Sequence, residues 1–188
     1  ALTLRAPTID VRAAITAGTI DLAASSALTL TASLSGSQVI AIRTPGALSL
    51  GSALAAPDID VQTGGKLTLQ STVTGTQVSL DGQTGIAQGL DAARVNAMAL
   101  TLVTGNGTVG DSTRALAIDL AGSDARLDLR AVGDVYLREV AGDLRLGSVQ
   151  ASGKTVTLAT ASGAIVGIQS GDAAQVQASS LILNATGG

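Results

Sequence analysis

Carboxylates are the side chains with the widest catalytic scope in this 188-residue sequence. The chain contains no His and no Cys, so the commonest general base, the thiolate nucleophile and the commonest metal ligand are absent. The reactions left open are those of paired acids in glycosidases, or of acids combined with Lys or Arg in polysaccharide lyases. The candidate acids are Asp10, Asp21, Asp60 and Asp128.

These four aspartates share one setting, the middle of an apolar-polar-apolar tripeptide such as Ile9-Asp10-Val11. Alternate side chains of a strand point to opposite faces, so we expect the four on a solvated outer face. Nothing in the sequence brings them to a base or to a sugar-stacking ring, since Tyr136 is the only aromatic residue. We predict no catalytic residues and no enzyme activity, with a polysaccharide-active enzyme as an alternative.

The sequence also lacks the loops that bind metals and phosphates. No Gly-Gly-x-Gly-x-Asp-x-apolar-x nonapeptide of calcium-binding solenoids and no EF-hand loop occurs. Gly105-Asn106-Gly107 has no downstream Gly-Lys-Ser/Thr, so we interpret it as a turn and not as a phosphate loop. We predict no metal-binding residues and no cofactor.

Charge and hydropathy exclude two further classes. The formal net charge is −3 and the eleven basic residues are scattered singly between Arg5 and Lys154, which argues against nucleic-acid binding. Mean hydropathy is +0.44, yet Thr, Ser, Asp or Gly interrupts every apolar run before the roughly 18 residues of a membrane helix. We therefore expect a chain that is not membrane-embedded.

The same tripeptide pattern recurs from Leu2-Thr3-Leu4 to Leu181-Ile182-Leu183, at spacings of roughly 8 to 11 residues. Gly, Ser, Ala, Asp and Thr lie between these tripeptides, and no stretch sustains the spacing of apolar residues that is typical of a helix. This alternation is typical of short strands with one buried face, joined by tight turns. A sandwich core of this size normally contains aromatic rings, whereas this chain offers only Leu, Val, Ile and Ala, which suit a narrow interior. We predict an all-β fold, a β-solenoid in a single elongated repeat domain.

A longer repeat supports stacked coils. Ala6-Pro7-Thr8-Ile9-Asp10-Val11 matches Ala56-Pro57-Asp58-Ile59-Asp60-Val61 at an offset of 50 residues. Two coils of about 25 residues would produce this offset, and so would shorter coils with insertions. At about 20 to 25 residues per coil, the chain would form about 7 to 9 coils.

The least regular stretch is 83–99, where Gly85, Gly89 and Asp91-Ala92-Ala93-Arg94 break the alternation. We predict a loop or one helical turn here, projecting from the solenoid as a neutral excursion or as a binding loop. The chain begins directly in strand pattern, without Met or a signal segment. We interpret residues 1–188 as a repeat segment of a larger protein.

Threonines alternate at Thr29 and Thr31 and again at Thr155 and Thr157, as in the flat ladders of ice-binding solenoids. The corresponding positions elsewhere are irregular, for example Thr101 with Val103. Ice binding is therefore a minor alternative.

The stretch 133–149, Gly-Asp-Val-Tyr-Leu-Arg-Glu-Val-Ala-Gly-Asp-Leu-Arg-Leu-Gly-Ser-Val, resembles the repeats of filamentous-haemagglutinin-type adhesins. It continues through Val156-Thr157-Leu158 to Ser162-Gly163-Ala164-Ile165. The resemblance implies a right-handed parallel β-helix, export from a Gram-negative cell, and a secreted or outer-membrane-associated location at the cell surface. It also implies a role in adhesion, biofilm formation or presentation of a distal virulence module.

We therefore predict a structural shaft of a secreted cell-surface adhesin. Its expected partners are the neighbouring repeats of the same polypeptide, and host-cell glycans or proteins if the segment itself binds. The alternative function is a direct glycan- or protein-binding adhesive module.

Overall fold

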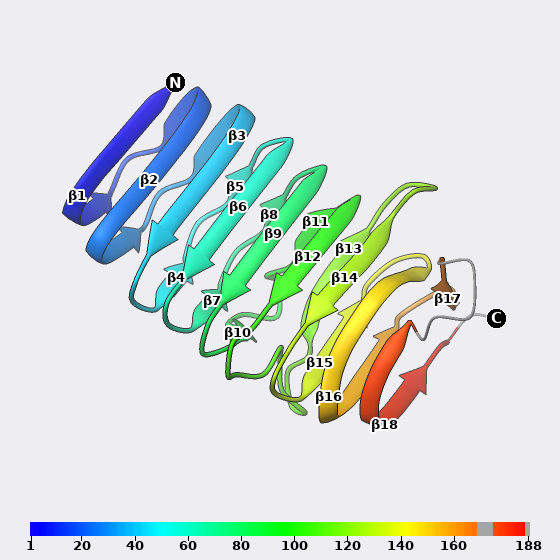
Figure 1. The fold of residues 1–188 in the computed structure, drawn as a ribbon. Coiled ribbons are helices and arrows are strands. Elements are labelled where there is room, and N and C mark those ends of the chain that lie inside the picture. The colour runs from blue at the N-terminus through cyan, green and yellow to red at the C-terminus, as the bar shows by residue number, and fades with distance from the viewer. Residues whose placement is uncertain (169–174, 187–188) are drawn as a thin grey trace.

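Strands and turns make up the whole of the described chain. The computed structural model describes residues 1–168 and 175–186, and these contain no helix. Within them, eighteen strands pair in parallel in one continuous sheet, wound into about eight stacked coils (Figure 1). The prediction of an all-β, elongated β-solenoid is confirmed.

Strands of two to six residues occupy the middle of the chain, and the longest strands lie towards its ends. In chain order they are β1 (Leu2–Val11), β2 (Ile15–Leu30), β3 (Leu34–Thr44), β4 (Leu48–Leu50), β5 (Leu54–Ala55), β6 (Asp58–Thr63), β7 (Leu67–Leu69), β8 (Val73–Thr74), β9 (Gln77–Gly82), β10 (Ile86–Gln88), β11 (Val95–Ala97), β12 (Ala99–Val103), β13 (Leu116–Leu120), β14 (Arg126–Arg130), β15 (Val135–Glu139), β16 (Leu144–Thr160), β17 (Ile165–Gly167) and β18 (Val176–Asn184). β1 and β18 lie at opposite ends of the solenoid (Figure 1).

The coil period is nineteen residues in the regular part of the chain. Ile40 pairs with Ile59, and Ile59 pairs with Val78, each nineteen residues further on. The coil from Val78 to Leu100 takes twenty-two residues, and the coil from Leu100 to Leu127 takes twenty-seven. Insertions therefore begin in the middle of the solenoid.

The offset of 50 residues is not a coil repeat. Ile9 pairs with Leu28, whereas Ile59 pairs with Ile40 and belongs to a different stack of strands. The two similar hexapeptides thus lie on different faces. The pattern misleads because every face of the coil requires the same alternation of inward aliphatic and outward polar residues.

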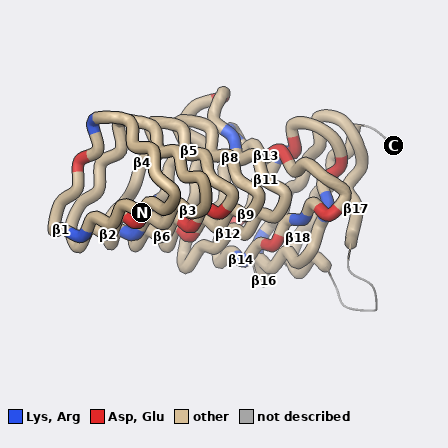
Figure 2. The backbone as a smooth tube through the Cα atoms, turned by 90° about the horizontal axis from the view of Figure 1, so that it is seen from above, with Lys and Arg blue, Asp and Glu red and all other residues tan. Residues whose placement is uncertain are grey.

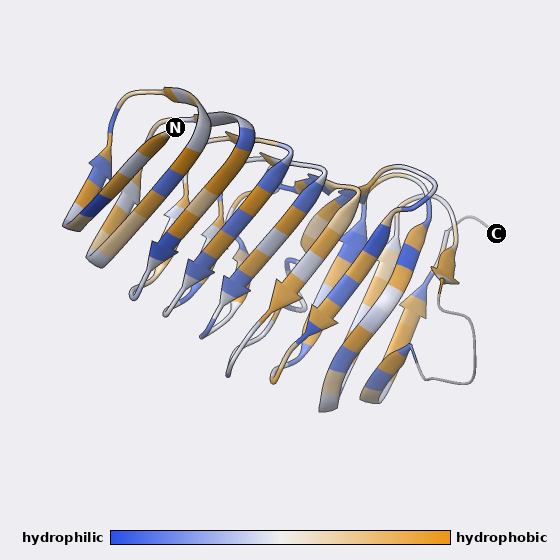
Figure 3. Cartoon of the chain, turned by 45° about the horizontal axis from the view of Figure 1, so that its top comes forward, coloured by the Kyte–Doolittle hydropathy of each residue, from blue (hydrophilic) through white to orange (hydrophobic). Residues whose placement is uncertain are grey.

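The interior is a set of aliphatic columns running along the solenoid axis. Ile20, Ile40 and Ile59 stack on one another and are fully buried. The alternation of apolar and polar residues along each strand is visible in Figure 3. Burying each such side chain contributes about 1.5–3 kcal/mol, so stability accumulates coil by coil.

Inward threonines close one of the corners. The hydroxyl of Thr63 donates to the carbonyl of Gly65 at 3.0 Å, and that of Thr104 donates to Gly107 at 2.8 Å. Gly105-Asn106-Gly107 is therefore a corner turn, as predicted. Stacked corners lie so close that a Cβ on Gly107 would be 2.0 Å from the carbonyl oxygen of Thr84.

The last coil leaves its apolar residues uncovered. Leu181 pairs with Val156 and Leu183 with Leu158, and within residues 1–168 and 175–186 no strand pairs with β18 on its other side. Their exposed fractions are 45% and 50%, whereas Val156 and Leu158 are fully buried. The column of inward residues thus ends in an apolar surface that matches the underside of another coil.

Candidate functional site

The four candidate aspartates are engaged by arginines on the outer surface. Figure 2 shows charged positions close to β2, β3 and β9 and others on the opposite side of the solenoid, for example close to β8. Each of the four carboxylates has an ion-pair partner. The pairs are Arg12 with Asp10 at 2.6 Å, Arg5 with Asp21 at 2.6 Å, Arg43 with Asp60 at 2.8 Å, and Arg126 with Asp128 at 3.2 Å.

The structure does not bring these aspartates together as a catalytic pair. Asp21 and Asp60 occupy the same outer row, but Ala41 lies between them in the intervening coil. Arg43 reaches both, at 3.7 Å from Asp21 and 2.8 Å from Asp60. A cation thus fills the space that a substrate would need between two acids.

The threonine rows are equally irregular. Thr29 stacks on Asp10, and Thr157 stacks on Tyr136. A surface that matches an ice lattice needs one residue type repeated in successive coils, and these two rows lack it.

The irregular stretch 83–99 is largely part of the regular coil. β10 and β11 both lie within it, with Ile86 paired to Leu67 and Val95 paired to Val73. The additional residues are confined to 89–94, which form a turn in which Ala93 N–H donates to the Leu90 carbonyl at 3.1 Å. The preceding coil spans the same corner with residues 70–72 alone.

A second insertion, residues 110–115, lies directly beside the first. Gly110 begins it with a φ of +64°, a conformation that favours glycine. Asp111 then closes the loop by accepting hydrogen bonds from the backbone N–H groups of Thr113 at 2.8 Å and Arg114 at 2.7 Å. These bonds and that of the Thr113 hydroxyl lower the pKa of Asp111, the hydroxyl contributing most. The Gly-Asp-Ser-Thr string was the available sequence signal, because such residues favour turns.

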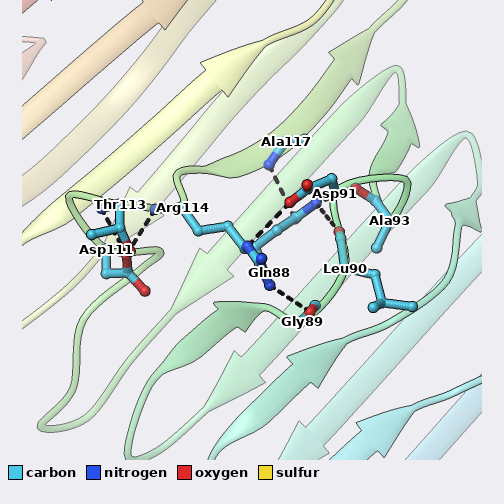
Figure 4. A network of polar contacts seen from close by, with 9 residues as sticks. All are labelled: Gln88, Gly89, Leu90, Asp91, Ala93, Asp111, Thr113, Arg114 and Ala117. Carbon is cyan, nitrogen blue, oxygen red and sulfur yellow. Dashed lines mark hydrogen bonds and ion pairs between the residues drawn. The ribbon is translucent and has the colours of Figure 1, made fainter.

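We call residues 88–94 together with 110–117 the insertion cluster (Figure 4). Arg114 connects its two loops: a guanidinium nitrogen donates to the Gly89 carbonyl at 2.7 Å, and Nε lies 3.2 Å from Asp91 Oδ1. The pair is largely exposed, so its contribution to stability is about 0.2–1 kcal/mol. Its main effect is to hold the two loops in one arrangement.

Gln88 anchors the insertion cluster to the core. It pairs with Leu69 and occupies an inward position that is leucine in earlier coils. Its buried Nε2 donates to the carbonyls of Leu90, at 2.7 Å, and Ala93, while Oε1 accepts from Ala117 N–H at 3.3 Å. The glutamine side chain thus forms hydrogen bonds with backbone groups of the insertion that are not paired in the sheet ladder.

A shallow depression lies between the insertion cluster and the next coil. Its lining is almost entirely polar or small. It is formed by Gln88, Asp91, Ser112, Thr113, Arg114, Ala115, Ala117 and Arg138.

A buried acid, Glu139, was missed in the sequence. The alternation of Val135 and Leu137 makes Glu139 the third inward position of its strand, and this was the available signal. Its side chain is fully buried, and burial, opposed by hydrogen bonds from Ala141 and Leu120, raises its pKa to about 7. Asp119 adds to this increase.

The described residues hold no cluster of three or more acidic side chains that could bind a metal ion. Over the same residues, no helix is long and apolar enough to cross a membrane. No protein-family model, no curated protein and no solved structure matches this chain.

Proposed function

We propose that this chain is a shaft segment of a secreted, cell-surface adhesin and that it contributes length and rigidity. The observation that carries the proposal is the parallel stacking of like residues through about eight coils. Each coil contacts only its neighbours, so such a chain extends in one direction as residues are added. At about 4.8 Å per coil, eight coils give about 38 Å of length.

The outer surface supports this passive role. Four aspartates are already paired with arginines of the same chain, two of them with arginines from neighbouring coils. Polar groups that satisfy one another in this way have little to offer a ligand. Export from a Gram-negative cell, biofilm formation and presentation of a distal module belong to the same proposal and derive from the adhesin-like repeat at 133–149.

The neighbouring repeats of the polypeptide are the proposed partners of the coil ends. Leu181 and Leu183 expose an apolar layer in the same register as the coil beneath. Another coil of this type would cover that layer and pair with the open edge of β18.

Tandem copies of the chain test the shaft function. One, two and three copies would be placed between an outer-membrane anchor and a fluorescent epitope, and the height of the epitope above the lipid would be measured by energy transfer to a membrane dye. We expect a linear increase of about 38 Å per copy. Matched Gly/Ser linkers should instead grow with about the square root of length, and the same behaviour in the tandem series would contradict the proposal.

A second function, direct adhesion, is favoured by the insertion cluster. Additional residues gather there in two successive coils and are ordered by Arg114 and Gln88, as expected of binding loops on a rigid scaffold. Replacing residues 89–94 by the Gln70-Ser71-Thr72 connection of the preceding coil should abolish saturable binding to host cells. Unchanged binding by this variant would exclude the cluster as the adhesive site.

A further inference from the structure

The depression beside the insertion cluster has a floor of two alanines. Ala117 pairs with Arg138 of the next coil, and Leu116 with Leu137, which places Ala115 level with Tyr136. Small side chains on one coil beside long ones on the next create the hollow. Loop residues 112–114 form its other wall.

Arg138 provides an unused positive charge at this hollow. Its side chain is exposed and makes no hydrogen bond or ion pair with any residue that the structure describes. Asp91, the acid that lines the hollow, pairs with Arg114, and Asp111 accepts bonds from its own turn. Asp119 lies two residues after Ala117 on β13 and does not line the hollow. A planar guanidinium without a partner is suited to bidentate binding of a carboxylate.

The rest of the lining offers hydroxyl chemistry. Ser112 and Thr113 contribute side-chain hydroxyls on the loop wall. The Ser112 hydroxyl can donate to and accept from the hydroxyls of a sugar, whereas that of Thr113 already donates to Asp111 and is left as an acceptor. Outside the lining, Tyr136 lies two residues before Arg138 on the same face of β15 and is the only aromatic residue of the chain. An aromatic side chain beside a polar hollow provides an apolar surface for a sugar ring.

From these contacts we propose that the depression binds the carboxylate of an acidic saccharide, with Arg138 as its principal contact. The proposal rests on the direct-adhesion function and specifies its ligand. A peptide partner fits less well, because protein interfaces centre on large apolar anchors in pockets. The exposed Leu90 does not line the depression, and in Figure 4 its side chain points away from Arg114.

Sialic acids and uronic acids both supply such a carboxylate, and paired probes distinguish them. Binding to the complete chain would be measured by calorimetry for sialyllactose against lactose, and for oligogalacturonate against its methyl ester. We expect one acidic probe to bind and its neutral counterpart not to bind. The Arg138→Gln variant should lose about tenfold or more in affinity.

Arg130→Gln is the matched control, because Arg130 is also exposed and without an ion pair in the described residues but lies on β14, outside this depression. It should bind like the parent chain. Thermal unfolding of both variants checks that the fold is retained.

Three results would overturn the proposal: no binding of either acidic probe, equal binding of acidic and neutral probes, or unchanged affinity in Arg138→Gln. Equal or tighter binding of polyglutamate would assign the site to an acidic protein and would also overturn it. Direct adhesion would survive these failures if cell binding still required residues 89–94, and the shaft function is tested separately by the tandem copies.

Discussion

The carboxylate of Glu139 accepts hydrogen bonds from the backbone N–H of Leu120, at 3.1 and 3.2 Å, across two successive coils. It also accepts from Ala141 N–H at 3.3 Å. Its inward neighbours in the same column are Ile118 and Thr160. An acidic side chain therefore takes an inward position that is usually aliphatic. It joins two coils at the place where a loop interrupts the ladder of backbone hydrogen bonds between them.

The first prediction concerns pH. Burial raises the pKa of Glu139 from 4.5 to about 7, so between these values the folded chain binds more protons than the unfolded chain. The contribution of this group is thus largest below pH 4.5 and is lost as the pH rises to about 7. Glu139→Gln keeps an acceptor but cannot ionise. The free energy of unfolding would be measured with denaturant at pH 5 and at pH 8. Its decrease from pH 5 to pH 8 should be smaller in this variant than in the parent chain.

Asp119→Asn is a second test of the same group, because the Asp119 charge adds to the raised pKa of Glu139. This variant should shift the loss of stability to lower pH without removing it. An identical pH profile in the parent chain and in Glu139→Gln would contradict the assignment of the pH effect to Glu139.

The fold could be predicted from the sequence because every coil repeats one local rule, and the absence of aromatics restricted the interior to a narrow column. The number of residues per coil could not be predicted, because Ile9 and Ile59 obey that rule on different faces of the solenoid. The insertion cluster was located only in part. Its first loop breaks the alternation, but the bond from Arg114 to Gly89 spans twenty-five residues and depends on a stacking register that composition does not encode.

The second prediction tests whether stability depends on coverage by neighbouring coils. Leu50 and Leu183 are both inward leucines, but Leu50 is fully buried and Leu183 is 50% exposed. Leu50→Ala should lower the free energy of unfolding by about 2–5 kcal/mol. Leu183→Ala should cost much less, since its site is already open to solvent. Equal losses in urea unfolding would show that the last coil is covered in solution, for example by a second copy.

The third prediction concerns the close approach of stacked corners. A Cβ at Gly107 would lie 2.0 Å from the Thr84 carbonyl oxygen, whereas at Gly18 the nearest atom is the Ser37 hydroxyl at 3.8 Å. Gly107→Ala should therefore lower the thermal midpoint by several degrees, as expected for a loss of about 1–3 kcal/mol from overpacking. Gly18→Ala, at an open position, should be neutral or slightly stabilising. Similar midpoints for the two variants would mean that the corners are more widely spaced than the structure shows.

The fourth prediction sets hydrogen bonding against hydrophobicity at Gln88. Gln88→Leu restores the leucine found at this position in earlier coils, and apolar burial alone would predict a gain in stability. It also leaves the carbonyls of Leu90 and Ala93 and the N–H of Ala117 without the side chain that satisfies them. Because unsatisfied buried groups cost about 1–3 kcal/mol each, we expect a net loss of stability. Hydrogen exchange should become faster in residues 89–94 and at Ala117.

Gln70→Leu is the control for this substitution, because Gln70 is exposed and lies in the corresponding corner of the preceding coil. It should change neither stability nor exchange. A gain in stability in Gln88→Leu, with slow exchange retained in residues 89–94, would mean that these loops hold their shape without the glutamine. The preorganised binding surface would then depend on Arg114 alone, and Arg114→Gln should release both loops.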